Sequence, residues 1–244
     1  MLSLKTEDQK KTYLQNLLDT VYLTDIIERY KIRQDAELRE LLQIPASGLG
    51  SLTNPHKLER TFHSKKNVGL SYNTIVSYLD YLEDAFLIEK ALRYDVKGKR
   101  YINTPYKFYF TDLGLRNAFL GFRQMEMNHI MENIIYNELN VRDYSVDVGV
   151  VEVHYKDKDQ QSRLKQLEVD FVANKGDKRY YIQSAYRMDT DARRAQEQRS
   201  LLRIDKSFKK IIIVGDSIYS HYNEQGILNV SIHDFLLDEH SLDR

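Results

Sequence analysis

Two short stretches decide the fold of the second half of the chain, Glu168-Val169-Asp170-Phe171-Val172-Ala173 and Tyr181-Ile182-Gln183-Ser184-Ala185. Both are rich in β-branched or aromatic residues, which is typical of β-strands. The polar run 174–178 between them predicts a turn, so the two strands should form a hairpin. Asp170 stands among apolar residues, where an unpaired carboxylate would be costly to bury, and this favours a functional origin for Asp170.

The segments around this hairpin predict an α/β unit. Apolar residues at helical spacing predict a helix over 127–141, and a highly charged helix is expected over 189–204. Strands are predicted at 144–155, 164–173 and 179–186, and in the apolar run Ile211-Ile212-Ile213-Val214. The order helix, three strands, helix, strand indicates a central mixed sheet covered by helices.

The first half is predicted to be helical up to residue 86. Ser71 can cap a helix because its hydroxyl can accept a free backbone amide, and Pro55 suits the first position of a shorter helix. Asp35 is expected to cap a further helix, which Pro45 and Gly48 should end. The helix after Ser71 should bury a stripe formed by Ile75, Val76, Leu79, Leu82 and Phe86.

After these helices the pattern predicts a hairpin. Strands are expected at 88–94 and 101–110, on either side of the basic turn Lys97-Gly98-Lys99-Arg100. Helices followed by such a hairpin resemble a winged-helix module, with residues 71–86 as recognition helix and 97–100 as wing tip. We therefore expect two domains, a helical winged-helix-type domain over 1–121 and an α/β domain over 122–244.

Composition excludes several classes of protein. The 36 Lys and Arg residues balance the 36 Asp and Glu residues, which argues against a broad basic coat for nucleic acid. The absence of cysteine excludes disulfides, thiolate zinc sites and cysteine nucleophiles. No phosphate-binding loop of the form Gly-x4-Gly-Lys-Ser/Thr is present, so this chain itself should not hydrolyse ATP. Without a signal peptide or a long apolar run, we expect a cytoplasmic protein with no membrane contact.

Glu132, Asp170 and Gln183 form the candidate catalytic site. They stand on a predicted helix and two neighbouring strands, and acidic groups gathered there can hold Mg²⁺, which prefers oxygen ligands and activates water. The pattern resembles the PD-(D/E)XK nuclease fold, in which Glu132 matches the helix acid, Asp170 the strand acid and Gln183 the acid-or-Gln position. Glu132 and Asp170 would then be the metal ligands. The position expected to hold Lys is Ala185, which argues against cleavage unless a neighbouring cation, from Lys165, Lys178 or Arg187, replaces it.

A second group of residues could contact DNA. Polar and basic side chains at a helix N-terminus and a wing can bind phosphates, which positions a protein without reading sequence. The candidates are Ser71, Asn73, Thr74, Lys97, Lys99 and Arg100, with Lys65 and Lys66 just before the helix. The alternative is that the winged helix only packs against other domains, which zero net charge favours.

Blocks along nearly the whole chain resemble the C-terminal region of prokaryotic AAA-type ATPases that carry a C-terminal domain of unknown function. The matching blocks are residues 22–33, 74–88, 107–117, 132–139, 168–173 and 181–186. The resemblance implies a winged helix followed by a nuclease-like domain, normally attached behind an ATPase that would bind ATP and that this sequence lacks.

From these observations we expect a non-catalytic DNA- or partner-binding module. The alternative is a Mg²⁺-dependent endonuclease that uses an atypical site without the Lys. A third hypothesis is an interaction subunit that binds a protein partner through the charged helix 189–203. No feature of the sequence indicates an oligomeric state.

Overall fold

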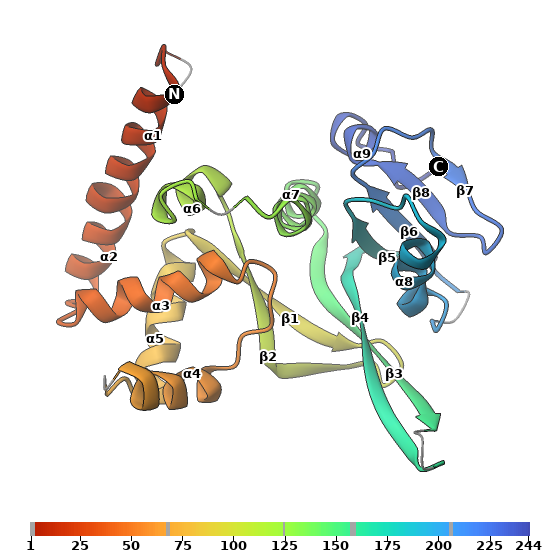
Figure 1. Cartoon of the computed structure of the whole chain (residues 1–244), viewed down its shortest axis with the longest axis horizontal. Helices are drawn as coiled ribbons and strands as arrows, with labels where there is room; N and C mark the ends of the chain where they lie inside the picture. Colours follow the sequence, from red (N-terminus) through yellow and green to blue (C-terminus); the bar gives the residue numbers. More distant parts are fainter. Residues whose placement is uncertain (1–2, 67–68, 124, 157–159, 205–206) are drawn as a thin grey trace. The chain divides into compact units, whose positions relative to one another are not determined.

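Helices and a mixed sheet of eight strands make up the fold of this computed structural model, which describes residues 3–66, 69–123, 125–156, 160–204 and 207–244 (Figure 1). The chain divides into two units. The first contains Met1–Lys90 and Lys107–Glu126, and the second contains Ala91–Tyr106 and Met127–Arg244. The division therefore runs through a hairpin rather than only through a linker, and it differs in this respect from the expected boundary at residue 121.

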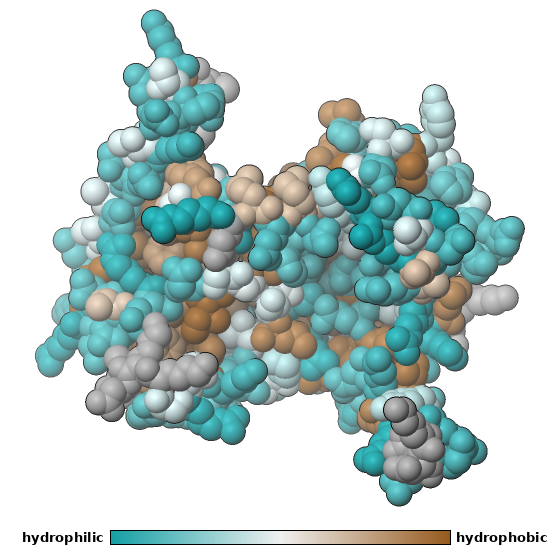
Figure 2. All heavy atoms as spheres, in the orientation of Figure 1, coloured by the Kyte–Doolittle hydropathy of each residue, from teal (hydrophilic) through white to brown (hydrophobic). Residues whose placement is uncertain are grey.

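The first unit is mainly helical. Its helices are α1 (Glu7–Asn16), α2 (Thr24–Arg29), α3 (Asp35–Ser47), α4 (Pro55–Thr61), α5 (Tyr72–Asp84) and α6 (Leu113–Phe119), with π-helical turns at Leu17–Leu23 and Phe62–Lys66. Leu14 is the one buried residue of α1, and Figure 2 shows that the visible face of this helix is mostly hydrophilic. Fully buried leucines and isoleucines of α2, α3 and α5 form the core, among them Ile26, Leu41 and Ile75.

Pro55 begins α4 and Ser71 caps α5, as predicted, whereas three details of this unit were wrong. Asp35 lies in the first turn of α3 and makes no cap, because Gln34 occupies the capping position. Pro45 does not end α3, which continues to Ser47 with Pro45 buried inside it. Phe86 is 75% exposed, because α5 ends at Asp84 and the chain turns at Phe86 with a positive φ of 54°.

The predicted hairpin consists of β1 (Ile88–Asp95) and β2 (Arg100–Phe110), and its tip belongs to the second unit. Residues 93–95 of β1 pair in parallel with residues 148–150 of β3 (Ser145–Lys156). The Val96 amide then continues this pairing by donating to the Val150 carbonyl at 2.9 Å. The strand that leads into the expected wing tip, residues 97–100, is thus hydrogen-bonded to β3.

The second unit contains the helix–strand order expected from the sequence. Its elements are α7 (Met127–Val141), β3, β4 (Ser162–Lys175), β5 (Lys178–Ala185), α8 (Asp191–Leu201), β6 (Lys209–Val214), β7 (His221–Tyr222), β8 (Leu228–Ser231) and α9 (Ile232–Leu237). The whole sheet has the order β2-β1-β3-β4-β5-β6-β8-β7. Strands β3, β4 and β5 are antiparallel, and β5, β6 and β8 are parallel. The helices and the large mixed sheet confirm an α+β fold.

An extra residue in β4 interrupts the pairing with β3. Asp147 pairs with Val172 and Gly149 pairs with Val169, so two steps along β3 face three steps along β4. Such a bulge bends the strand and re-aims side chains. Gly149 is needed here, since a Cβ at this position would lie 2.9 Å from both Val169 Cβ and Val172 Cγ2. The bulge places Asp170 in its position in the site.

Candidate functional site

A pocket of about 430 Å³ in the second unit contains all three residues predicted to form the catalytic site. Glu132 enters it from α7, Asp170 from β4 and Gln183 from β5. The remaining lining residues come from α7, the end of β5 and α8, and are Asn128, His129, Ser184, Ala185, Tyr186, Arg187, Arg193, Gln196 and Glu197. The pocket is therefore polar and combines carboxylates, amides and two arginines.

Asp170 lies where β4 and β5 separate. The ladder between these strands ends at the pair Phe171–Ile182, and β5 then continues beside β6 as far as Ala185. At this fork the Ser184 amide donates to Asp170 Oδ2 at 2.7 Å. Asp170 is 7% exposed, so this hydrogen bond is buried. The carboxylate takes the place of the backbone carbonyl that would accept from the Ser184 amide if the strands continued to pair. Asp170 thus has a structural role that does not require a metal.

Glu132 lies on the buried face of α7 and is 9% exposed. Glu138, six positions later, accepts from Arg142 Nε at 2.7 Å and lines a different pocket. This separation agrees with the 100° rotation per residue of a helix, which turns Glu138 away from Glu132. One carboxylate of α7 therefore contributes to the site.

Gln183 is held by two α8 residues that the sequence analysis missed. Ser200 Oγ donates to Gln183 Oε1 at 3.4 Å, so the amide oxygen that the nuclease pattern would offer to a metal already accepts a hydrogen bond. Glu197 lies beside Gln183, and burial raises the pKa of the Glu197 carboxyl while a hydrogen bond with Gln183 opposes this shift. Glu197 and Ser200 are one helical turn apart, and this spacing could have indicated that both lie on the same face of α8.

Ala185 stands where the nuclease pattern has Lys, and it belongs to the apolar core. It is 3% exposed and packs with Leu201, Ile212 and Val214 on the α8 side of the sheet. Of the three cations considered as replacements, Arg187 lines the pocket. Lys165 pairs with Val153 on the outer part of the β3–β4 hairpin, and Lys178 Nζ donates to Asp243 at 2.8 Å.

The pocket contains some of the oxygen donors that the expected magnesium ion would need. Within the described ranges, no group of three or more His, Asp or Glu side chains is arranged to hold a metal. Glu132 and Asp170 would be the protein ligands, and Mg²⁺ is often held by one or two carboxylates together with water. Besides Glu132 and Asp170 the pocket contains the carboxyl of Glu197, which lies beside Gln183. Asp170 Oδ2 already accepts from the Ser184 amide.

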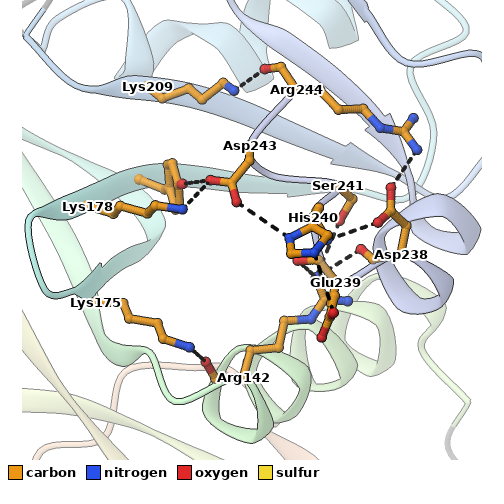
Figure 3. A network of polar contacts seen from close by, with 11 residues as sticks. Arg142, Lys175, Lys178, Lys209, Asp238, Glu239, His240, Ser241, Asp243 and Arg244 are labelled. Atoms are coloured by element: carbon orange, nitrogen blue, oxygen red, sulfur yellow. Dashed lines mark hydrogen bonds and ion pairs between the residues drawn. The ribbon is translucent and has the colours of Figure 1, made fainter.

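The second pocket of this unit is a polar network that attaches the C-terminal segment (Figure 3). Arg142, at the end of α7, donates to the carbonyls of Asp238 and Glu239 and to Phe235. Asp243 accepts from Lys178 at 2.8 Å and from Tyr180 at 2.5 Å. The Lys178 hydrogen bond holds the pKa of Asp243 below its usual range. Because these partners satisfy one another, we assign this network to stability.

The six residues predicted to contact DNA are divided between the two units. Ser71 Oγ is the cap of α5 and accepts from the Thr74 amide at 3.2 Å, while Thr74 is half-buried. Asn73 is exposed. The side chains of Lys65 and Lys66 lie outside the described part.

The other three DNA candidates lie at the hairpin tip. Lys97 Nζ donates to the Glu152 carbonyl at 3.2 Å, and Arg100 Nε lies 3.4 Å from Asp95 Oδ2. Asp95 also accepts from the amides of Lys97 and Gly98, which fixes the turn. Lys99 is exposed, and its backbone has a positive φ of 52° in the turn. Only part of the predicted group is therefore available to a ligand.

A family described as domain of unknown function DUF8612 matches residues 1–126, more than half of the 244 residues. The chain belongs to this family. The DUF8612 match ends at Glu126, where the first unit also ends.

Two curated relatives extend the match into the second unit. An uncharacterized protein of Haemophilus influenzae is 35% identical over 231 residues, which are 95% of this chain and 53% of the relative. Uncharacterized protein MJ1544 of Methanocaldococcus jannaschii is 26% identical over 230 residues, 93% of this chain and 48% of the relative. The chain thus spans about half the length of the curated relatives it matches.

A solved structure, protein VC1899 from Vibrio cholerae, aligns with 98% of this chain and 57% of its own, at 14% identity and a TM-score of 0.30.

Within the described residues, no helix has the length and apolar character needed to cross a membrane.

Proposed function

We propose that this chain is a non-catalytic DNA- or partner-binding module of an AAA-type ATPase, built from a winged helix and a PD-(D/E)XK nuclease-like domain. The observation that carries the proposal is the buried Ala185 at the position of the nuclease Lys. A Lys there would orient water and stabilise developing negative charge, and a methyl group packed against Leu201 can do neither. The pocket keeps the acidic groups of the pattern without this cation.

The hydrogen bonds of the pocket support the same proposal. Asp170 Oδ2 accepts from the Ser184 amide, and Gln183 Oε1 accepts from Ser200. Both oxygens would have to give up or share these bonds to bind a metal. The element order α7-β3-β4-β5-α8-β6, with antiparallel β3, β4 and β5 followed by parallel β6, supports the nuclease-like interpretation.

The proposed ATPase would lie outside the stretch described here. The relatives are about twice as long as their matched regions, which leaves room in them for a further domain. The chain itself has no phosphate-binding loop, so ATP would be bound only through that other domain.

Plasmid DNA incubated with the chain and Mg²⁺ tests whether the site cleaves. We expect no nicking above that of an Asp170→Asn variant, which keeps an acceptor for the Ser184 amide and so should remain folded. Cleavage that depends on Mg²⁺ and disappears in Asp170→Asn would overturn the non-catalytic proposal.

DNA and protein partners are separated by a binding titration at several salt concentrations. If DNA is the partner, affinity should fall as salt rises, because phosphate contacts release counterions. Lys99→Ala should then weaken DNA binding without a loss of stability, whereas Lys97→Ala should lower stability because it removes the contact with Glu152. Binding to DNA that ignores salt, or an unchanged affinity in Lys99→Ala, would refute the contribution of the hairpin tip.

A Mg²⁺-dependent endonuclease is the second candidate function. The observation that favours it is the convergence of Glu132, Asp170 and Gln183 from three elements in one pocket that Arg187 also lines. In that case Arg187 would supply the missing cation, and Arg187→Ala should abolish any cleavage seen in the plasmid assay.

A further inference from the structure

Strands β3 and β4 extend beyond the other strands of the sheet as a two-stranded ribbon. The β1–β3 pairing reaches Val150 and the β4–β5 pairing reaches Phe171, whereas β3 and β4 remain paired out to Lys156 and Ser162. Figure 1 shows the two strands continuing past the tip of the β1–β2 hairpin. We call residues 153–156 and 160–166 the arm, and all of them except Val153 are exposed.

The arm exposes large side chains on both of its faces. Tyr155 is 48% exposed and Leu164 is 51% exposed. Tyr155 pairs with Arg163, the residue before Leu164. Because successive residues of a strand point to opposite faces, Tyr155 and Leu164 lie on different faces. A ribbon of only two strands is marginally stable in water, so a partner that takes up the arm would stabilise it.

The charged side chains of the described arm are all cations. Arg163 shares the face of Tyr155, and so does Lys165, whose partner Val153 lies two positions before Tyr155. Lys156 lies on the other face. Neither Lys156 nor Lys165 makes a hydrogen bond or ion pair with a residue that the structure describes. The arm therefore carries positive charge on both faces.

The sequence through the arm is basic although the whole chain is neutral. Residues 153–166 contain four cations and two acids, which leaves a net charge of +2; they are Lys156, Lys158, Arg163 and Lys165, and Asp157 and Asp159. At the β1–β2 tip, by contrast, Lys97 Nζ donates to the Glu152 carbonyl and Arg100 lies beside Asp95, which leaves Lys99 exposed. The arm thus offers more free cations for phosphates than the tip does.

A two-stranded ribbon with cations on both faces fits the major groove of B-form DNA. This groove is about 12 Å wide and about 8.5 Å deep, admits a β-ribbon, and is bordered by the phosphates of both strands. Residues 153–156 span about 10 Å at the usual rise of about 3.4 Å per residue, which is enough to reach the floor of the groove. The major groove of duplex RNA is too narrow for side chains to read.

We propose that the arm inserts into the major groove of duplex DNA. In this arrangement Lys156 faces the phosphates along one side of the groove, and Arg163 and Lys165 face those along the other. Tyr155 can donate its hydroxyl to a phosphate. This inference rests on the DNA-binding form of the proposed function, and it names the element that binds and the form of nucleic acid that is bound.

The test is binding of the full chain to a short DNA duplex, measured by fluorescence anisotropy over a series of salt concentrations. Lys156→Ala/Lys165→Ala should reduce the slope of log affinity against log salt by about two, because each phosphate contact contributes about 0.9. Affinity at low salt should fall about tenfold or more. The control Lys5→Ala/Arg33→Ala removes the same charge from exposed positions outside the arm and should leave both quantities unchanged. All four side chains are exposed, so both variants should remain folded, which circular dichroism checks.

The groove is identified by protection of guanine N7 from dimethyl sulfate, since this atom lies in the major groove. We expect protection by the unsubstituted chain and its loss with Lys156→Ala/Lys165→Ala at the same protein concentration. Duplex RNA of the same sequence should bind about tenfold more weakly or less, because its major groove excludes the arm.

Each possible failure has a distinct meaning. An unchanged salt slope in Lys156→Ala/Lys165→Ala would overturn the arm proposal, as would DNA binding without protection of guanine N7 or an equal affinity for duplex RNA. If this variant binds like the unsubstituted chain while Lys99→Ala binds more weakly, the arm proposal fails and the proposed DNA-binding function stands. If the chain binds no duplex at any salt concentration, the DNA part of the proposed function fails together with the arm proposal.

Discussion

The stability of Asp170 variants distinguishes a structural carboxylate from one kept only for a metal. The Ser184 amide donates to Asp170 Oδ2 at 2.7 Å in a place where the side chain is 7% exposed. A hydrogen bond to a charged group contributes about 1.5–3 kcal/mol, and burial places this bond in the upper part of the range. Asp170→Ala should therefore lower the free energy of unfolding by about 2–3 kcal/mol. Asp170→Asn, which keeps an acceptor oxygen, should lose less than half of that.

Urea denaturation of the full chain, followed by far-ultraviolet circular dichroism and tyrosine fluorescence, measures these differences. Asp177→Ala is the matched control, because this acid is exposed in the turn after β4 and should stay within about 0.5 kcal/mol of the unsubstituted chain. If Asp170 served only to hold a metal beside Glu132, removing its charge would relieve repulsion between two acids. An increase in stability in Asp170→Ala would thus refute the structural role.

Three further predictions concern stability. Gly149→Ala should lower the free energy of unfolding by about 1–3 kcal/mol in the same denaturation assay, because the new Cβ would lie 2.9 Å from Val169 and Val172; an unchanged midpoint would contradict the close approach at the bulge. The hydrogen bond from Lys178, and then that from Tyr180, lowers the pKa of Asp243 in the folded state, so the ionised Asp243 stabilises the fold above its unfolded pKa of about 3.9, and this stabilisation is lost as pH falls through the folded pKa. The free energy of unfolding of Asp243→Asn should therefore fall less steeply with acid than that of the unsubstituted chain, and an identical acid dependence would count against the network. Burial raises the pKa of Glu197 in the folded state, so the free energy of unfolding should fall as pH rises from the unfolded pKa of about 4.3 to the higher folded pKa. Glu197→Gln should remove this fall, and a free energy of unfolding that instead rises over this interval in the unsubstituted chain but not in Glu197→Gln would contradict the assigned sign.

Helices and strands with strong periodicity were predictable from the sequence. The helix over 127–141 is confirmed to the residue, since its apolar positions recur at helical spacing and long periodic segments are the most readable. By contrast β7, β8 and α9 are two to six residues long, too short for a period to be evident. Pro45 was predicted to end its helix, because proline usually breaks helices, but α3 continues past it to Ser47 with Pro45 buried.

Site residues were predictable where a single residue stood out from its neighbours in the sequence. They were not predictable where the site depends on contacts between distant parts of the chain. Asp170 stood out as an acid in an apolar strand, and Glu132 and Gln183 followed from the pattern around it. Glu197 and Ser200 lie in a helix whose charges suggested a solvated face or a surface for a protein partner, not a part of this pocket. The docking of the hairpin tip on β3 joins residues 93–95 with 148–150, and such non-local pairing leaves no mark in the local sequence.

We propose that the pocket of Glu132, Asp170 and Gln183 has no nuclease chemistry. A crystal of the chain soaked in Mn²⁺, with anomalous scattering measured at the pocket, tests it most directly. We expect no anomalous peak between Glu132 and Asp170, with Asp170 still accepting from the Ser184 amide. A peak bridged by the two carboxylates would contradict it and support the endonuclease.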